Sequence, residues 1–367
     1  MLARLRIIPV VQTLQVDVGH ARYPITIGAG LLRDRELLAE IPGTALLIVT
    51  NTTVAHLHLA DLKSRLDGRA VGECILPDGE HYKTLQTAGR VFDSLVEHRL
   101  NRDGTVLALG GGVVGDIAGF AAACYQRGIG YVQIPTSLLA QVDSSVGGKT
   151  GVNHSGGKNL IGAFHQPLAV LADTDTLATL PDRELRAGIA EVIKYGCVWD
   201  AALLDWLDAH MDELLAREPG ALRHAIARSC EIKATVVGRD EREQNVRAIL
   251  NFGHTFGHAI EAATSYERYL HGEAVAIGML MAADFSCRLG LIDGAAKRRV
   301  RNVVVRAGLP TEAPKIGLSR ALALMHMDKK VLAGTIRVVV LEKLGRAIIV
   351  GEYPQHELEA TLNEFFE

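Results

Sequence analysis

Histidine and glutamate residues gather in one short stretch of the sequence, where their spacing could bind a metal ion. They are His254, His258, Glu261, His271 and Glu273. On a helix, the first two histidines stand one turn apart and the first glutamate follows three residues later on the same face. Imidazole together with carboxylate suits Zn²⁺, and a catalytic zinc site keeps one position open for substrate. The intervening residues are mostly apolar, which favours a cleft over the alternative, a solvated polar helix face.

Helical periodicity alone does not choose three ligands among these five side chains, and a sixth candidate lies upstream. In the segment EVIKYG at 191–196, Lys194 follows Glu191 by three residues and shares its helix face. A cation beside a metal-binding carboxylate could meet an oxyanion of a substrate. The alternative for this pair is an ordinary ion pair on the surface of a helix.

A glycine-rich turn, GGGVVGD at 110–116, follows a predicted strand and matches G-x-G-x-x-G. Glycines let the backbone approach a pyrophosphate, and the start of the next helix supplies N–H donors. The alternative is a turn without a ligand. A standard Rossmann unit places an acidic residue about 20 positions further on to bind the ribose, but residues 126–136 contain none. The ribose must be held from elsewhere, and the candidates are Asn51 and DGEHYK at 78–83, which could also be a solvated turn.

A second glycine cluster comprises DSSVGGKTG at 143–151 and GGKN at 156–159. Lys149 and the threonine after it resemble the end of a P-loop, but that motif needs a glycine where this chain has Asp143. We therefore reject a P-loop. Two lysines in G-G-K contexts, Lys149 and Lys158, predict Gly-rich loops that bind an anion beside a carboxylate.

The elements that must position these residues change in type along the chain. Apolar runs at 45–49, 105–109 and 131–134 suit strands buried in a parallel sheet, and 14–18 with 23–27 suit a hairpin. Each of the three runs ends in Gly, Ser, Thr or Asn, and parallel sheets bind ligands at the carboxyl ends of their strands. Helical periodicity then dominates at 182–198, 201–216, 222–236, 254–264, 272–289 and 295–307, and strand-like runs return only at 336–341 and 347–350.

The fold class that follows is a Rossmann-like α/β N-terminal domain with a mostly parallel sheet, joined to an all-α C-terminal domain. We place the first domain at 1–175 and the second, mainly helical and carrying the metal and substrate residues, at 176–367. Two such domains predict a cleft between them.

Composition excludes several classes of protein. The chain has 367 residues, of which 48% are hydrophobic and 22% charged, as in globular proteins. Its net charge of −3 argues against nucleic-acid binding. Five cysteines without a CxxC pair indicate a reducing compartment. The N-terminal apolar stretch, broken by Pro9, is too short for a signal peptide, and the run at 274–283 is about half of a membrane span. We expect a cytoplasmic protein without a nucleic-acid or membrane partner.

Several motifs spread over nearly the whole chain match one known family. They are GGGVVGD at 110–116, PTSLLAQVDSSVGGK at 135–149, EVIKYG at 191–196, LNFGHTFGHA at 250–259, HGEAVA at 271–276 and DKK at 328–330. Together they resemble the 3-dehydroquinate synthases of the sugar phosphate cyclase superfamily. The long motif at 135–149 is highly specific.

The resemblance implies an activity and its cofactors. The family converts the sugar phosphate DAHP (3-deoxy-D-arabino-heptulosonate 7-phosphate) into 3-dehydroquinate and phosphate, the second step of the shikimate route to chorismate. It uses catalytic NAD and one divalent metal, zinc or cobalt. Hydride leaves C5 and later returns, so NAD is not consumed; between these steps phosphate is eliminated, and an internal aldol closure completes the reaction. The family also implies a homodimer in which Arg127 is lent to the neighbouring subunit.

The resemblance also implies roles for individual residues. The metal ligands would be Glu191, His254 and His271, with His258 facing the substrate. NAD would lie along Asn51, Asp78, Gly79, Glu80, His81, Tyr82, Lys83, Gly112, Val113, Val114, Gly115, Asp116, Thr136, Ser137, Lys149, Lys158, Thr176, Leu177, Ala178 and Thr179. The catalytic and substrate-binding set would be Arg127, Asp143, Lys149, Asn159, Lys194, Lys233, Arg247, Asn251, His258 and Lys330, with the choice between Lys329 and Lys330 left open.

Three other functions compete with this one. Another sugar phosphate cyclase would share the scaffold, but Lys233, Arg247, Asn251 and His258 all keep the pattern that favours DAHP. A metal-dependent alcohol dehydrogenase would exchange NADH with solvent and need no lysine-rich phosphate pocket. A non-catalytic NAD- or metal-binding protein would not need every expected catalytic position to be filled.

Overall fold

The computed structural model describes residues 11–66, 68–326 and 336–367, so the predicted substrate residue Lys330, with Lys329, lies outside the described residues. The chain divides into two compact units. The first extends to Leu180 and includes 222–238, and the second holds 181–221 and 239–367. The predicted division after residue 175 did not anticipate that 222–238 would join the first unit.

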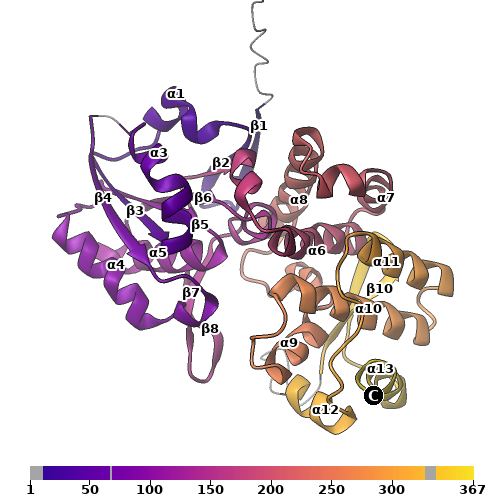
Figure 1. Ribbon diagram of the computed structural model, residues 1–367. Coiled ribbons are helices and arrows are strands. Elements are labelled where there is room, and N and C mark those ends of the chain that lie inside the picture. Colours follow the sequence, from indigo (N-terminus) through magenta and orange to yellow (C-terminus); the bar gives the residue numbers. More distant parts are fainter. Residues whose placement is uncertain (1–10, 67, 327–335) are drawn as a thin grey trace, which may run out of the picture. The chain divides into compact units, whose positions relative to one another are not determined.

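The first unit is built on a seven-stranded sheet (Figure 1). In spatial order its strands are β1 (Gln12–Asp17), β2 (Arg22–Gly28), β9 (Ala169–Asp173), β6 (Gly130–Pro135), β5 (Thr105–Gly110), β3 (Ala45–Asn51) and β4 (Ala70–Leu76). β1 pairs with β2 antiparallel, as the sequence predicted, and all other pairs are parallel. The sequence did not predict β4, an edge strand that alternates buried and exposed residues, or the short β9.

Helices cover both faces of this sheet, which explains why its central strands are apolar throughout. In β3, Leu47 and Val49 pack with α4 (Leu85–Glu97) and α5 (Gly112–Cys124), whereas Leu46 and Ile48 pack into a second cluster on the other face. Burial of each such side chain contributes roughly 1.5–3 kcal/mol. The other helical segments of this unit are η1 (Leu31–Arg33), α1 (Arg35–Ala39), α2 (Thr52–Val54), η2 (Ala55–Leu59), α3 (Ala60–Lys63), η3 (Glu80–Tyr82), η4 (Tyr125–Arg127), η5 (Ala140–Ser144) and η6 (Thr174–Thr179).

The second glycine cluster forms a hairpin, not two loops. β7 (Lys149–His154) pairs antiparallel with β8 (Gly157–Phe164). Lys149 lies opposite Phe164 at the base of this hairpin, whereas Lys158 lies beside its turn. Both lysines therefore lie in strands and not on the Gly-rich loops that the sequence predicted, and their binding of an anion stays a prediction.

The second unit is mainly helical, with one hairpin at the two predicted strand-like runs. Its elements are α6 (Asp182–Val198), α7 (Ala201–Leu215), η7 (Val246–Asn251), α9 (His254–Ala263), α10 (His271–Arg288), α11 (Gly294–Arg306), α12 (Leu318–His326), β10 (Val338–Lys343), β11 (Arg346–Val350) and α13 (Gln355–Phe366). α8 (Pro219–Arg239) carries the residues that join the first unit. Within the described ranges, no helix is both long enough and apolar enough to cross a bilayer.

Helix α10 is the buried centre of the second unit and packs against α6, α9, α11, α13 and β10. Two glycines let it approach its neighbours at backbone distance. A Cβ on Gly272 would overlap the carbonyl oxygen of Ala187 in α6, and a Cβ on Gly278 would overlap that of Gly253. Gly272 follows His271 and Gly253 precedes His254, so both close contacts adjoin histidines of the predicted metal set.

The buried carboxylate of Asp284 ties α10 to two other helices. It accepts hydrogen bonds of 2.7 Å from Arg288 Nε and from Thr361 Oγ1 in α13, and it forms an ion pair with Lys297 in α11. Burial alone would raise the pKa of Asp284, but Lys297, Thr361 and Arg288 together hold that pKa below its ordinary value of 3.8.

We expect Asp284→Ala to lower the free energy of unfolding by about 3 kcal/mol at neutral pH, because it leaves buried donors and cations without their carboxylate. A group with a lowered pKa stabilises the fold above its unfolded pKa, and this contribution is lost as the pH falls through the folded value. The difference from wild type should therefore shrink below pH 3.8. Urea unfolding at neutral and acidic pH measures both effects. Asp212→Ala, at a position 92% exposed, is the control and should change little.

Candidate functional site

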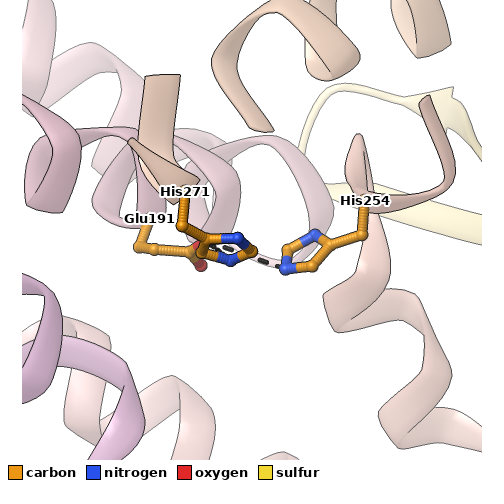
Figure 2. A group of neighbouring side chains, drawn as sticks. All are labelled: Glu191, His254 and His271. Carbon is orange, nitrogen blue, oxygen red and sulfur yellow. Dashed lines mark ion pairs between the residues drawn. The ribbon is translucent and has the colours of Figure 1, made fainter. Parts of the chain in front are cut away.

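Three side chains of the second unit converge from three different helices (Figure 2). Glu191 lies in α6, and His254 and His271 are the first residues of α9 and α10. One ligand atom from each lies within 4.8 Å of the others. The Nε2 atoms of His254 and His271 are 3.8 and 3.9 Å from Glu191 Oε1. Of the six candidates that periodicity left open, the structure brings together the three that the family resemblance implies.

The chemistry of this group fits a divalent cation. Glu191 is 1% exposed, and apart from its ion pair with Lys194 neither of its carboxylate oxygens accepts a well-formed hydrogen bond within the described part of the chain. A buried carboxylate is costly unless cations compensate it. Two imidazoles and one carboxylate are the donor set of many zinc sites. The side chain of His271 is 37% exposed, so the group is open to solvent on one side, as a catalytic site requires.

Hydrogen bonds orient the lone pairs of both imidazoles toward Glu191. The Nδ1 atom of His254 lies 3.2 Å from the carbonyl oxygen of Phe252, which can only accept. Nδ1 of a neutral ring therefore carries the hydrogen, and Nε2 presents a lone pair toward Glu191. His271 has the same arrangement, with Nδ1 3.4 Å from Glu261 Oε1.

Three of the candidates from the sequence, His258, Glu261 and Glu273, lie outside this group. The ring of His258 is 5.7 Å from that of His254 and 6.2 Å from that of His271, beside the three ligands. Glu273 accepts hydrogen bonds from the amide of Leu270 and from Arg183, each at 2.7–2.8 Å. Burial alone would raise the pKa of Glu273, but these donors hold it below its usual value. Glu273 thus caps α10, as its position three residues after the N-cap could have indicated.

Lys194 forms an ion pair with Glu191. The pair is buried, since both side chains are at most 2% exposed. The alternative of a surface ion pair is excluded. The Lys194 ammonium also lies 5.1 Å from the centre of the Tyr195 ring. A positive charge is thus held directly beside the carboxylate of the candidate metal group.

Arg247 and Asn251 lie on η7, which precedes α9. The buried Arg247 donates to the carbonyl oxygen of Glu241, and Asn251 Nδ2 donates to Glu243 Oε1 at 2.5 Å. Both predicted substrate residues are therefore held by the chain segment just before them.

In the first unit, the predicted cofactor segments follow the carboxyl ends of parallel strands. β3 ends at Asn51, β5 at Gly110, β6 at Pro135 and β9 at Asp173, all at one edge of the sheet. The following α5 begins at Gly112 without a side-chain cap. The N–H groups of its first turn, which include Val113 and Val114 before Gly115, are thus donors of the kind that bind phosphate.

The two candidate ribose-binding segments adjoin each other. Asn51 Nδ2 donates to Asp78 Oδ1 at 2.6 Å, and Thr53 Oγ1 donates to Asp78 Oδ2 at 2.6 Å. Asp78 follows β4, which is the strand next to β3. This edge therefore has an acidic side chain although residues 126–136 have none.

Lys83 joins three parts of the first unit. It is buried and donates to Asp116 Oδ2 in α5 at 2.5 Å and to Asn159 Oδ1 in β8 at 2.6 Å. Burial lowers the pKa of Lys83, but the carboxylates of Asp116 and Glu80 outweigh it and raise that pKa above its usual value. The sequence named these residues separately and contained no signal that they are bonded to one another.

Lys233 of α8 and Asp143 of η5, both predicted substrate residues, form a pair in the first unit. Lys233 Nζ is 2.9 Å from Asp143 Oδ1 and donates to the Asp143 carbonyl oxygen at 2.6 Å. Arg127 is exposed and follows Gln126; both residues have positive φ angles, 69° and 48°.

The remaining predicted cofactor residues occupy the same strand-end segments as those above. They are Gly79, His81 and Tyr82 around η3, Thr136 and Ser137 after β6, and Thr176, Leu177, Ala178 and Thr179 in η6.

Comparison with known proteins places this fold in one class, the dehydroquinate synthase-like proteins. A 2-epi-5-epi-valiolone synthase of Streptomyces hygroscopicus, solved with NAD⁺ and Zn²⁺ bound, is 33% identical, with a TM-score of 0.86 over 94% of this chain and 96% of that one. A 2-deoxy-scyllo-inosose synthase, solved with carbaglucose-6-phosphate, NAD⁺ and Co²⁺, is 25% identical, with a TM-score of 0.86 over 96% and 100%.

The sequence comparisons are more specific. The family models for the 3-dehydroquinate synthase N-terminal and C-terminal parts match residues 73–187 and 188–331. A 3-dehydroquinate synthase of Nitrosococcus oceani is 56% identical over 354 residues, which are 96% of this chain and 99% of that protein. The chain belongs to the 3-dehydroquinate synthase family.

The geometry predicts that His271→Ala loses most of its bound zinc while the fold persists, because one of three converging ligands is removed. Metal analysis after dialysis, with circular dichroism to check the fold, measures this. His258→Ala is the matched control and should retain zinc, since His258 lies beside the group. A metal-replete His271→Ala protein would remove His271 from the ligand set.

Proposed function

We propose that this protein is a 3-dehydroquinate synthase that converts DAHP to 3-dehydroquinate and phosphate with NAD and one divalent metal, zinc or cobalt. The observation that carries the proposal is the convergence of Glu191, His254 and His271, with Lys194 buried against the carboxylate. Membership of the family supports the substrate, and the NAD⁺ and Zn²⁺ or Co²⁺ of the related structures support the cofactors. The enzyme is a carbon–oxygen lyase, because phosphate leaves by elimination.

The two cofactors supply the chemistry that side chains cannot. A bound divalent metal supplies Lewis acidity toward the hydroxyl oxygens of the substrate, and NAD supplies a reversible acceptor for hydride. The protein holds them with separate groups of residues. Glu191, His254 and His271 hold the metal, whereas the N–H groups at the start of α5 and the pair Asn51–Asp78 hold NAD.

Lys194 stabilises negative charge on the substrate. Its ammonium is held in a buried position beside Glu191, where little water competes for it. In such surroundings a fixed positive charge acts more strongly than at the surface, and it needs no reorganisation during the reaction. His258, beside the ligand group, contacts the substrate and not the metal.

The other cationic residues bind the two anionic groups of DAHP, its carboxylate and its phosphate. Arg247 and Lys233 are both buried, and each is already oriented by hydrogen bonds to the backbone. Such preorganisation reduces the entropy lost when the substrate binds. Lys149, Asn159, Asn251 and Lys330 complete the proposed substrate set.

The proposal includes a homodimer in which Arg127 serves the neighbouring subunit. Arg127 is exposed, and two consecutive residues with positive φ hold its backbone in a conformation that side-chain-bearing residues rarely adopt. Local backbone strain of this kind is often found at functional positions.

We expect the purified protein with DAHP, NAD and Zn²⁺ or Co²⁺ to release inorganic phosphate without net accumulation of NADH, because the hydride returns to the substrate. A phosphate assay run together with absorbance at the NADH band measures both. Steady growth of NADH would indicate a dehydrogenase. Phosphate release from other sugar phosphates but not from DAHP would indicate a different cyclase.

For Lys194→Met we expect turnover to fall by about 10²–10³-fold, because a preorganised charge beside the reacting centre is removed while the apolar part of the side chain is kept. Bound zinc should remain, since the three ligands are unchanged. The control is Lys343→Met, at an exposed position at the end of β10. Near-normal turnover of Lys194→Met would reject the role given to this lysine.

A further inference from the structure

Glu261 is a buried acid that has no role in the function proposed so far. It lies in α9, two helical turns after His254 and on the same face, and is 2% exposed. Its Oε1 atom is 3.4 Å from Nδ1 of His271, on the side of the ring opposite to Nε2, which faces Glu191. The imidazole of His271 therefore stands between two buried carboxylates.

This arrangement determines which nitrogen of His271 can bind a metal. A carboxylate accepts the Nδ1 hydrogen, which leaves the lone pair on Nε2, toward Glu191 and His254. The hydrogen bond thus selects the tautomer whose lone pair lies on the metal side.

The Glu261 carboxylate affects the His271 ring more strongly than a backbone carbonyl oxygen would in the same position. His254 has a backbone acceptor, the Phe252 carbonyl, which orients the ring but has no net charge. Glu261 adds a negative charge, which polarises the His271 ring and strengthens Nε2 as a donor to a cation. In the absence of a cation, the same charge is a buried carboxylate that destabilises the fold.

We propose that Glu261 is a positioning residue for the metal: it fixes the tautomer of His271 and raises the affinity of the site formed by Glu191, His254 and His271. The inference rests on the metal role in the proposed function. Glu273, the other acid in this stretch, has no such part, because Arg183 and the Leu270 amide already use its carboxylate.

The test is the zinc affinity of Glu261→Gln, measured by competition with a chromophoric chelator on the full-length chain. We expect binding about 10–100-fold weaker than in wild type, as for other carboxylates that orient a ligand histidine. Glu261→Asp keeps the charge but shortens the side chain, and should also bind zinc more weakly. Glu267→Gln is the matched control, a neutralised carboxylate at an exposed position shortly after α9, and should bind zinc like wild type.

Two further measurements separate a metal role from a structural one. The visible absorption spectrum of the Co²⁺-loaded protein should differ in Glu261→Gln, because the donor strength of one ligand changes. The melting temperature of the metal-free variant should equal or exceed that of metal-free wild type, since a buried charge has been removed. The increase in melting temperature on adding zinc should be smaller, because each tenfold loss of affinity removes about 1.4 kcal/mol of stabilisation.

The outcomes distinguish this inference from the proposed function. Wild-type affinity and an unchanged cobalt spectrum in Glu261→Gln would overturn the role of Glu261 and leave the metal site intact. A metal-free variant that melts well below wild type, with an unchanged response to zinc, would also overturn it and indicate a structural role. If wild type itself binds no zinc, or if His271→Ala keeps it, the proposed metal site is wrong.

Discussion

The candidate site depends on the close approach of helix α10 to its neighbours. At Gly272 and Gly278 there is no room for a side chain, because backbone carbonyl groups of Ala187 and Gly253 occupy that space. The first contact holds the start of α10 against α6, where Glu191 lies, and the second holds the residue before α9 against α10. Packing at backbone distance is rigid, so the fold itself holds the three ligand atoms within 4.8 Å of one another. Binding then requires little reorganisation of the protein.

The same close packing explains why the charges of the site are buried. Glu191, Lys194 and Glu261 are nearly inaccessible to water, and in the interior each charge must be compensated by another. Apolar residues in these positions would make a more stable core. We interpret the cluster as one that lowers the stability of the fold but allows catalysis. A divalent cation between the imidazoles and Glu191 would compensate the carboxylates, and Lys194 would remain next to them.

The first unit is the one that we propose to bind NAD, a large anionic cofactor, although the chain as a whole is acidic. The donors that we propose for it are mostly backbone N–H groups and hydroxyls at the ends of parallel strands, which would need few cations at that edge. The buried Lys83 connects the start of α5 with the β7–β8 hairpin through Asp116 and Asn159. The family resemblance assigns Lys83 and Asp116 to NAD and Asn159 to the substrate. The Lys83 ammonium thus joins the two predicted sets.

Much of this protein could be predicted from sequence alone. Periodicity located helices such as α6 and α10, and continuous apolar runs located β3, β5 and β6, because the side-chain pattern reflects which faces are buried. Family motifs named Glu191, His254 and His271. The patterns failed for β4, which lies at an edge, and for the glycine cluster that forms β7 and β8.

Only the tertiary structure shows which partners each of the three acids has. Glu191, Glu261 and Glu273 all fit the helical spacing, but their roles depend on partners far away along the chain. Arg183 donates a hydrogen bond to Glu273. Glu261 lies beside Nδ1 of His271, whereas Glu191 lies on the Nε2 side of the same ring. Local sequence records the periodicity of one helix. It does not record which helices meet, because their contacts depend on the packing of the whole unit.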